Sequence, residues 1–65
     1  MNIEYLKKYC IEKIKKYPSI KSEIREIYHL AMCEIKEGES ETNEVNLAIN
    51  DIDELIKELE DYYGY

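Results

Sequence analysis

Hydrophobic residues recur every three or four positions in three successive stretches of the chain. This spacing places them on one face of an α-helix and predicts helices over residues 3–16, 20–37 and 43–62. Alternation with a period of two, which β-strands show, is not sustained anywhere, and turn-forming residues cluster only at 17–19 and 38–43. Short connections favour antiparallel neighbours, so the pattern predicts an all-α fold, an up-down-up three-helix bundle.

The residues expected to face the core follow from the same periodicity. They are Ile3, Leu6, Cys10, Ile14 and Tyr17 in the first stretch, Ile20, Ile24, Ile27, Tyr28, Ala31 and Ile35 in the second, and Val45, Ala48, Ile49, Ile52, Leu55, Ile56 and Leu59 in the third. The second set covers the wider arc, as expected for a helix that contacts both of the others.

Residues at the ends of these stretches are of types that cap or end helices. Asn2 and Ser19 are expected to cap the first and second helices through their side-chain oxygens. Pro18 is expected to end the first helix, because the residue before a proline avoids the α region. Gly38 fits a left-handed C-cap for the second helix.

The chain has 65 residues, of which 45% are hydrophobic and 37% charged, a composition typical of a folded helical domain. We therefore expect one domain over residues 1–65, with a thin core. The net charge of −6 is uneven, since residues 1–17 carry five lysines and two acidic residues, whereas residues 37–65 carry ten acidic residues and one lysine. The two ends should attract each other, and the acidic surface should repel nucleic acid, so direct binding of nucleic acid is not expected.

Targeting signals are not evident in the chain. Its hydrophobic runs fall well short of the roughly 20 residues that a helix needs to cross a bilayer. The first residues, Met1 to Glu4, lack the basic-then-apolar order of a signal peptide. We expect a cytoplasmic protein without a membrane partner, in which Cys10 and Cys33 stay reduced.

Groups suited to catalysis or metal binding are sparse. His29 is the one histidine, and the two glycines are too far apart for a phosphate-binding loop. His29 and Cys33, four residues apart on a helix, make half of a zinc site at most, so a solvated helix edge is expected. The acidic stretch 37–44 has Gly38 in second place where an EF-hand needs glycine in sixth, and a helix connection is expected instead. We expect neither enzymatic activity nor a cofactor.

Side chains off the core-facing stripes are the better candidates for function. Leu47 lies almost opposite Ile52 on the third helix, and seven tyrosines are many for so short a chain. Tyrosine combines buried area with a polar tip and is enriched at binding surfaces. The candidate interaction surface comprises Tyr5, Tyr9, Cys33, Leu47, Asp51, Glu54, Glu58, Tyr62, Tyr63 and Tyr65.

Two groups of charged residues leave alternatives open. The acidic residues of the third helix form either a solvated face, with Asn50, Asp53, Glu54 and Lys57 outward, or an anionic ridge that mimics nucleic acid for a basic partner. The lysines of the first helix are expected to serve solubility and to complement the helix dipole, with binding of a small anionic ligand as the alternative. These are Lys7, Lys8, Lys15 and Lys16.

Two segments in the second half of the chain carry a resemblance. Residues 34–40 read Glu-Ile-Lys-Glu-Gly-Glu-Ser, and residues 44–56 read Glu-Val-Asn-Leu-Ala-Ile-Asn-Asp-Ile-Asp-Glu-Leu-Ile. Residues 20–57, including the gap between the second and third helices, resemble short tailed-bacteriophage proteins that have no assigned activity. The resemblance implies a phage accessory protein in the host cytoplasm that binds a host or phage protein.

The stretch Ile49-Asn50-Asp51-Ile52-Asp53 resembles the Ser-Gln-Glu-Leu-Asp signature of helical-hairpin phosphatases that act on sporulation response regulators. Here Ile49 replaces the serine, and Asn50 and Asp51 are each shorter than the residues of the signature. The resemblance implies a phosphatase in which an amide at position 50 orients the attacking water, a task for which Asn has less reach than Gln.

The function that the sequence favours is a non-enzymatic protein-interaction module, as a phage-encoded accessory protein or an inhibitor of a host protein. The alternatives are a self-associating structural subunit, an acidic nucleic-acid mimic and a phosphatase-like helical hairpin. The expected partner is accordingly another protein, or a second copy of this chain in a homo-oligomer.

Overall fold

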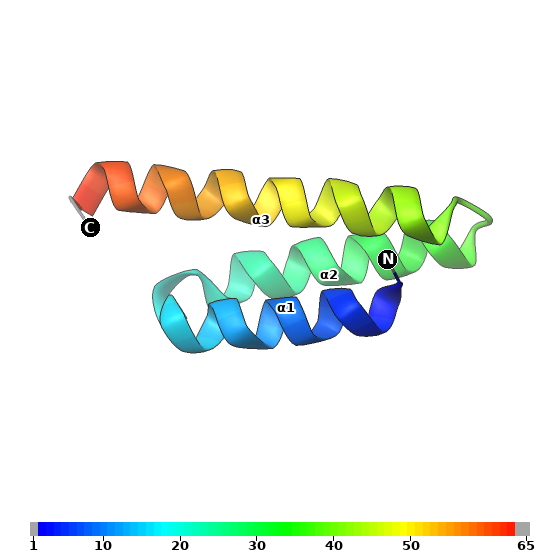
Figure 1. Cartoon of the computed structure of the whole chain (residues 1–65), viewed down its shortest axis with the longest axis horizontal. Helices are drawn as coiled ribbons and strands as arrows, with labels where there is room; N and C mark the ends of the chain where they lie inside the picture. The colour runs from blue at the N-terminus through cyan, green and yellow to red at the C-terminus, as the bar shows by residue number, and fades with distance from the viewer. Residues whose placement is uncertain (1, 64–65) are drawn as a thin grey trace.

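Three helices lie side by side in the computed structural model, which describes residues 2–63. They are α1 (Ile3–Lys16), α2 (Lys21–Lys36) and α3 (Glu41–Tyr63), with a short 3₁₀ turn, η1 (Pro18–Ile20), between α1 and α2. The chain runs up, down and up again (Figure 1), and each helix contacts the other two. The predicted all-α three-helix bundle is confirmed, and every predicted helix boundary lies within two residues of the observed one.

The core is built from the aliphatic stripe of each helix. Leu6, Ile24, Val45 and Ile52 are fully buried, so all three helices contribute to its centre. Complete burial of such a side chain contributes about 1.5–3 kcal/mol each to folding. The other buried residues are Cys10, Ile20, Ala31, Ala48 and Ile56, and all nine belong to the predicted stripes.

The turn between α1 and α2 differs from the sequence expectation. Pro18 begins the 3₁₀ turn, and the N–H of Ile20 donates a hydrogen bond to the carbonyl of Tyr17 at 3.2 Å. Ser19 lies inside this turn, so α2 begins only at Lys21 and without a side-chain cap. The predicted Ser19 cap is therefore wrong, because the fixed φ of proline suits the first position of a helical turn and starts one early. The Asn2 cap is confirmed, since its Oδ1 accepts a hydrogen bond from the N–H of Tyr5 at 3.0 Å.

A tight turn joins α2 to α3. Gly38 has a φ of +106°, the left-handed conformation that was predicted for it. Its N–H donates to the carbonyl of Ile35 at 3.1 Å, and the N–H of Glu39 donates to that of Glu34 at 3.0 Å. This is the pair of bonds of a Schellman motif. Ser40 then caps α3 by accepting a hydrogen bond from the N–H of Asn43 at 3.3 Å.

The bundle is elongated, with principal extents of 39 × 18 × 17 Å. Its length is set by α3, which has 23 residues against 14 in α1 and 16 in α2. The carboxyl end of α3 therefore extends past the turn that joins α1 to α2 (Figure 1). Over residues 2–63, no helix combines the length and the hydrophobicity needed to cross a membrane.

Candidate functional site

The outer groove between α2 and α3 is the strongest candidate for a functional site. It consists of two adjoining hollows of about 300 and 150 Å³, and Ile27, Leu30 and Asp51 line both of them. We call this continuous surface the acidic groove. Its lining residues are Glu23, Glu26, Ile27, Leu30, Ala31 and Glu34 of α2 and Glu44, Leu47, Ala48, Asp51, Glu54, Leu55 and Glu58 of α3.

Exposed leucines lie along the centre of the acidic groove. Leu30 is 58% exposed and Leu47 is 49% exposed, and both line the same hollow. Ile27 and Leu55 are half-buried and pack against the core. Helical periodicity explains this arrangement, because Ile27 and Leu55 lie at the edges of the core-facing stripes, whereas Leu30 and Leu47 lie outside them. Where the two edges meet, the apolar surface continues from the core to the solvent.

Acidic side chains surround these leucines on both helices. Seven line the groove: Glu23, Glu26, Glu34, Glu44, Asp51, Glu54 and Glu58. Among the described residues, neither hollow has a lysine or an arginine in its lining. So many like charges on one surface produce a negative potential that attracts cationic groups. The groove can therefore bind a ligand that is apolar at its centre and positive at its edges.

Four of the predicted surface residues meet in this groove. Leu47, Asp51, Glu54 and Glu58 of α3 all line it. The α2 half of the groove, with Leu30 at its centre, was missing from the predicted surface. Its signal was present in the sequence, since Glu23, Glu26, Ile27, Leu30 and Glu34 follow a helical spacing on one flank of α2. Periodicity alone does not show which flank of α3 this flank meets.

Tyr5 and Tyr9 lie away from the acidic groove, on the face between α1 and α3. The Tyr9 hydroxyl donates a hydrogen bond to Oδ1 of Asp53, so Asp53, expected on a solvated outer face of α3, bonds to α1 instead. The Tyr5 ring stacks on Tyr9 at 6.4 Å, and the Lys13 Nζ lies 5.2 Å from the Tyr9 ring centre. Desolvation, followed by the bond to Asp53, raises the pKa of Tyr9 above its ordinary value. Tyr9 thus serves contacts within the chain.

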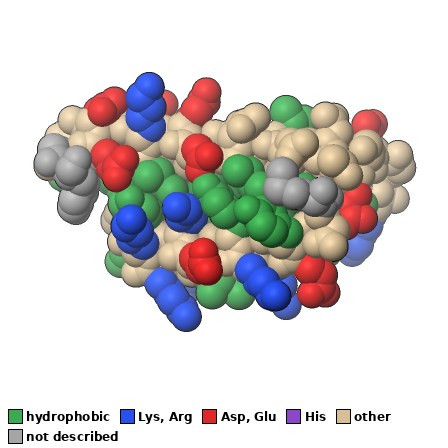
Figure 2. Space-filling view, in the orientation of Figure 1, with side chains coloured by type: hydrophobic (Ala, Val, Ile, Leu, Met, Phe, Trp, Pro, Cys, Tyr) green, Lys and Arg blue, Asp and Glu red, His purple; other side chains and the backbone are tan. Residues whose placement is uncertain are grey.

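Two more hydrogen bonds join α1 to α3 on this face. The hydroxyl of Tyr17 donates to Oε2 of Glu60 at 2.9 Å, and the N–H of Ile3 donates to Oε2 of Glu41 at 2.7 Å. Figure 2 shows this side of the molecule, where side chains of the hydrophobic class fill the band between the two helices and basic side chains gather along α1. The hydrogen bonds of Ile3, Tyr9 and Tyr17 to residues of α3 hold this face together.

The remaining predicted surface residues are separate from both of these regions. Cys33 is exposed on α2 and does not line the acidic groove. Tyr62 and Tyr63 are 81% and 64% exposed at the end of α3, with their rings edge to face at 4.8 Å. Tyr65 lies outside the described residues. The predicted surface is therefore distributed over several places.

The candidate catalytic and metal-binding groups are also dispersed. His29 is exposed, with its ring edge-on to Tyr28 at 5.9 Å. Over the part of the chain that the structure describes, no three potential ligands are close enough to share a metal ion. In the phosphatase-like stretch, Ile52 is fully buried, Asp51 lines the acidic groove and Asp53 bonds to Tyr9. These three side chains therefore point in different directions around α3.

Comparison with known proteins gives no relative from which a function could be transferred. No protein-family model matches the chain, and no curated protein or solved structure matches it. Its function has to be inferred from its own exposed surfaces and charges.

Proposed function

We propose that this chain is a non-enzymatic protein-interaction module whose acidic groove binds a basic amphipathic helix of a partner protein. The observation that carries the proposal is the pair of half-exposed leucines, Leu30 and Leu47, within a ring of seven acidic residues. Apolar side chains left accessible at the centre of a charged surface are a common feature of interaction sites.

The shape of the groove favours a helix as the ligand. A helix of the partner protein, packed between α2 and α3, would present apolar residues at its positions i, i+3, i+4 and i+7. These would contact Ile27, Leu30, Leu47 and Leu55. Its flanking lysines and arginines would then face the acidic residues, where opposite charges accelerate association and select the partner.

The apolar centre also separates this proposal from the nucleic-acid-mimic alternative. A mimic presents carboxylates to a surface that binds phosphates. Such a surface binds mainly through its positive charge, and exposed leucines would contribute little to that binding. Binding as a mimic would leave the side chains of Leu30 and Leu47 exposed to solvent, whereas an amphipathic helix would bury them. The leucines therefore favour the helix.

The resemblance of residues 20–57 to short phage proteins suggests where the partner is to be sought. We extend the proposal to a phage-encoded accessory protein or inhibitor that acts on a bacterial host protein in the cytoplasm. Under this proposal the partner contains an exposed basic helix, and binding the chain covers it.

The experiment is affinity capture from host lysate with three forms of the chain, followed by mass spectrometry of the captured proteins. Leu47→Asp should lose the partner, because it places a charge among apolar contacts. Ile11→Asp is the matched control, since Ile11 is 45% exposed and lies on α1 away from the acidic groove. It should retain the partner.

The same variants test the chemistry of the ligand. A synthetic peptide with a leucine stripe flanked by lysines should bind the wild-type chain, whereas the same peptide with glutamates in place of lysines should not. Binding should weaken as salt rises from about 0.05 to 0.5 M, because salt screens surface charges. A captured partner that binds Leu47→Asp as tightly as the wild type would show that the acidic groove is not the site.

A further inference from the structure

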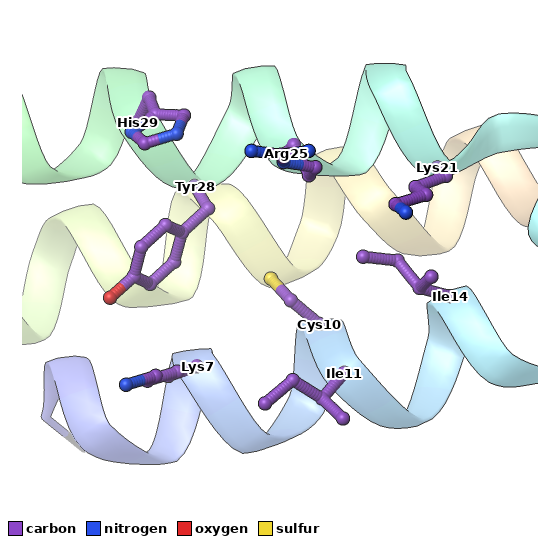
Figure 3. Close-up of a pocket in the computed structure, with 8 residues that line it drawn as sticks. All are labelled: Lys7, Cys10, Ile11, Ile14, Lys21, Arg25, Tyr28 and His29. Atoms are coloured by element: carbon purple, nitrogen blue, oxygen red, sulfur yellow. The ribbon is translucent and has the colours of Figure 1, made fainter.

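A second groove lies on the other flank of α2, between α1 and α2. It is a single hollow of about 270 Å³, lined by Lys7, Cys10, Ile11 and Ile14 of α1 and by Lys21, Arg25, Tyr28 and His29 of α2. We call it the basic groove. Figure 3 shows the Cys10 side chain directed from α1 toward α2, with Arg25 opposite it and Tyr28 reaching back toward α1 near Lys7.

The floor of the basic groove is apolar and uncharged. Cys10 is buried there beside Ile11 and Ile14, which come from the same helix. Burial raises the pKa of the Cys10 thiol to about 11, so the thiol is neutral at physiological pH. The floor therefore suits an aliphatic group.

The rim of this groove carries cations. Lys21 and Arg25 lie four residues apart on α2 and are neighbours on its surface, whereas Lys7 of α1 lies at the other end of the hollow, near Tyr28. Among the described residues, no aspartate or glutamate lines the hollow. A carboxylate placed against Arg25 can accept two parallel N–H bonds from the guanidinium, the strongest form of this contact.

We propose that the basic groove binds a medium-chain aliphatic carboxylate. The carboxylate lies against Lys21 and Arg25, and the aliphatic chain covers Cys10, Ile11 and Ile14. The hollow of about 270 Å³ lies near the lower end of the range of roughly 300–1,000 Å³ for small-ligand pockets, so a short carboxylate such as octanoate is the probe. The proposal is independent of the acidic groove and its protein partner.

The first experiment compares octanoate, octylammonium and butyrate by isothermal titration calorimetry on the full chain, below the concentration at which they form micelles. Octanoate should bind at least tenfold more tightly than butyrate, because butyrate covers less of the apolar floor. Octylammonium, which has the same tail and the opposite charge, can be attracted to the acidic groove but should not displace octanoate in a competition titration. Displacement of octanoate by octylammonium would overturn the proposal.

The second experiment tests the placement of the ligand. The double variant Lys21→Gln, Arg25→Gln should bind octanoate at least tenfold more weakly. The matched control is Lys36→Gln, Lys57→Gln, which removes the same charge from exposed lysines that do not line the groove. It should keep wild-type affinity, and circular dichroism checks that both variants remain helical. An equal loss in the two double variants would overturn the proposal, because it would show attraction by net charge alone.

The same assay tests the contact of the octanoate tail with Ile11 and the alternative that an acidic helix occupies the groove. Ile11→Ser should weaken octanoate binding, whereas Leu47→Ser, on the acidic groove, should leave it unchanged. A glutamate-rich amphipathic peptide that binds the groove while octanoate fails to displace it would overturn the proposal in favour of an acidic helix. Loss of the protein partner in Leu47→Asp with octanoate binding retained would separate the two grooves.

Discussion

The acidic groove and the basic groove share α2 as a wall, yet their linings have opposite charge. On one flank of α2, Glu23 and Glu26 line the same hollow as the exposed Leu30. On the other flank, Lys21 and Arg25 border the floor formed by α1. The buried stripe of α2, centred on Ile24, separates the two flanks.

The difference teaches that the net charge of a small bundle is a poor guide to the charge of its individual grooves. A net charge of −6 favours cationic partners over the molecule as a whole. The basic groove nevertheless presents a surface of the other sign, because helical periodicity sorts charged residues by flank. Within a few ångströms, local charge decides what binds, and screening weakens the contribution of the distant acidic residues.

The largest expected effect comes from destabilising α2, the helix that lines both grooves. Ile24→Ala removes a fully buried side chain from α2 and should lower the free energy of unfolding by about 2–5 kcal/mol. A domain of this size has a total stability of only about 3–10 kcal/mol, so both grooves should be lost together. Urea unfolding followed by circular dichroism measures the change. Leu30→Ala, at an exposed position on the same helix, is the control, and an equal loss there would contradict the burial of Ile24.

The next effect comes from the turn between α2 and α3. Gly38→Ala places a Cβ on a residue with a φ of +106°, where it meets no other atom within 4 Å. The cost is therefore backbone strain alone, about 1–2 kcal/mol in the free energy of unfolding. Urea unfolding should show this loss in Gly38→Ala and almost none in Glu39→Ala. A stability of Gly38→Ala equal to that of the wild type would rule out the left-handed cap.

A change in pH should affect the floor of the basic groove. Burial raises the pKa of Cys10 to about 11 from an ordinary value of 9.0, so the thiol holds its proton more tightly in the folded chain than in the unfolded one. Its contribution to stability is intact below pH 9 and is lost as the pH rises toward 11. By pH 10 the loss should be roughly 1 kcal/mol. Raising the pH from 8 to 10 should therefore lower the urea midpoint less in Cys10→Ala than in the wild type. In Cys33→Ala, at an exposed cysteine, the midpoint should fall as much as in the wild type.

The smallest effect should leave both grooves unchanged. Tyr9→Phe removes the hydrogen bond to Asp53 on the face between α1 and α3 and should cost about 0.5–1 kcal/mol. Thermal unfolding measures the loss, and Tyr5→Phe, a neighbouring exposed tyrosine, should cost less. Binding of the lysine-flanked peptide and of octanoate should both be retained. If Tyr9→Phe no longer bound the peptide or octanoate, the face between α1 and α3 would take part in binding.

The fold was predictable because each helix records its buried side in the spacing of its aliphatic residues. Leu6, Ile24 and Ile52 recur with their neighbours at helical intervals, and each is fully buried. The connection at Gly38 was predictable for a similar reason, since glycine is the residue that tolerates a left-handed cap. The cap of α2 was predicted wrongly at Ser19, because Pro18 begins a turn that the capping pattern did not reveal.

The candidate site was predicted only in part. The periodicity of a single helix fixes which flank a residue occupies, but not which flank of another helix lies beside it. Leu47 was identified because it left the stripe of its own helix, whereas its pairing with Leu30 depends on the rotation and axial position of both helices. The bond between Tyr9 and Asp53 depends on the same geometry and spans 44 positions of the chain.

The greater length of α3 has a consequence for experiments on this molecule. At 1.5 Å per residue, its 23 residues extend for about 35 Å, whereas the 14 residues of α1 extend for about 21 Å. The overhanging end, with Tyr62 exposed, is thus a site for a fluorescent label or a surface tether one helical turn beyond Glu58, the last residue of α3 that lines the acidic groove. Backbone amides in this last turn should exchange their hydrogens with deuterated solvent well before those near Ile52. Comparing the two exchange rates distinguishes local unfolding of the helix end from global unfolding of the bundle.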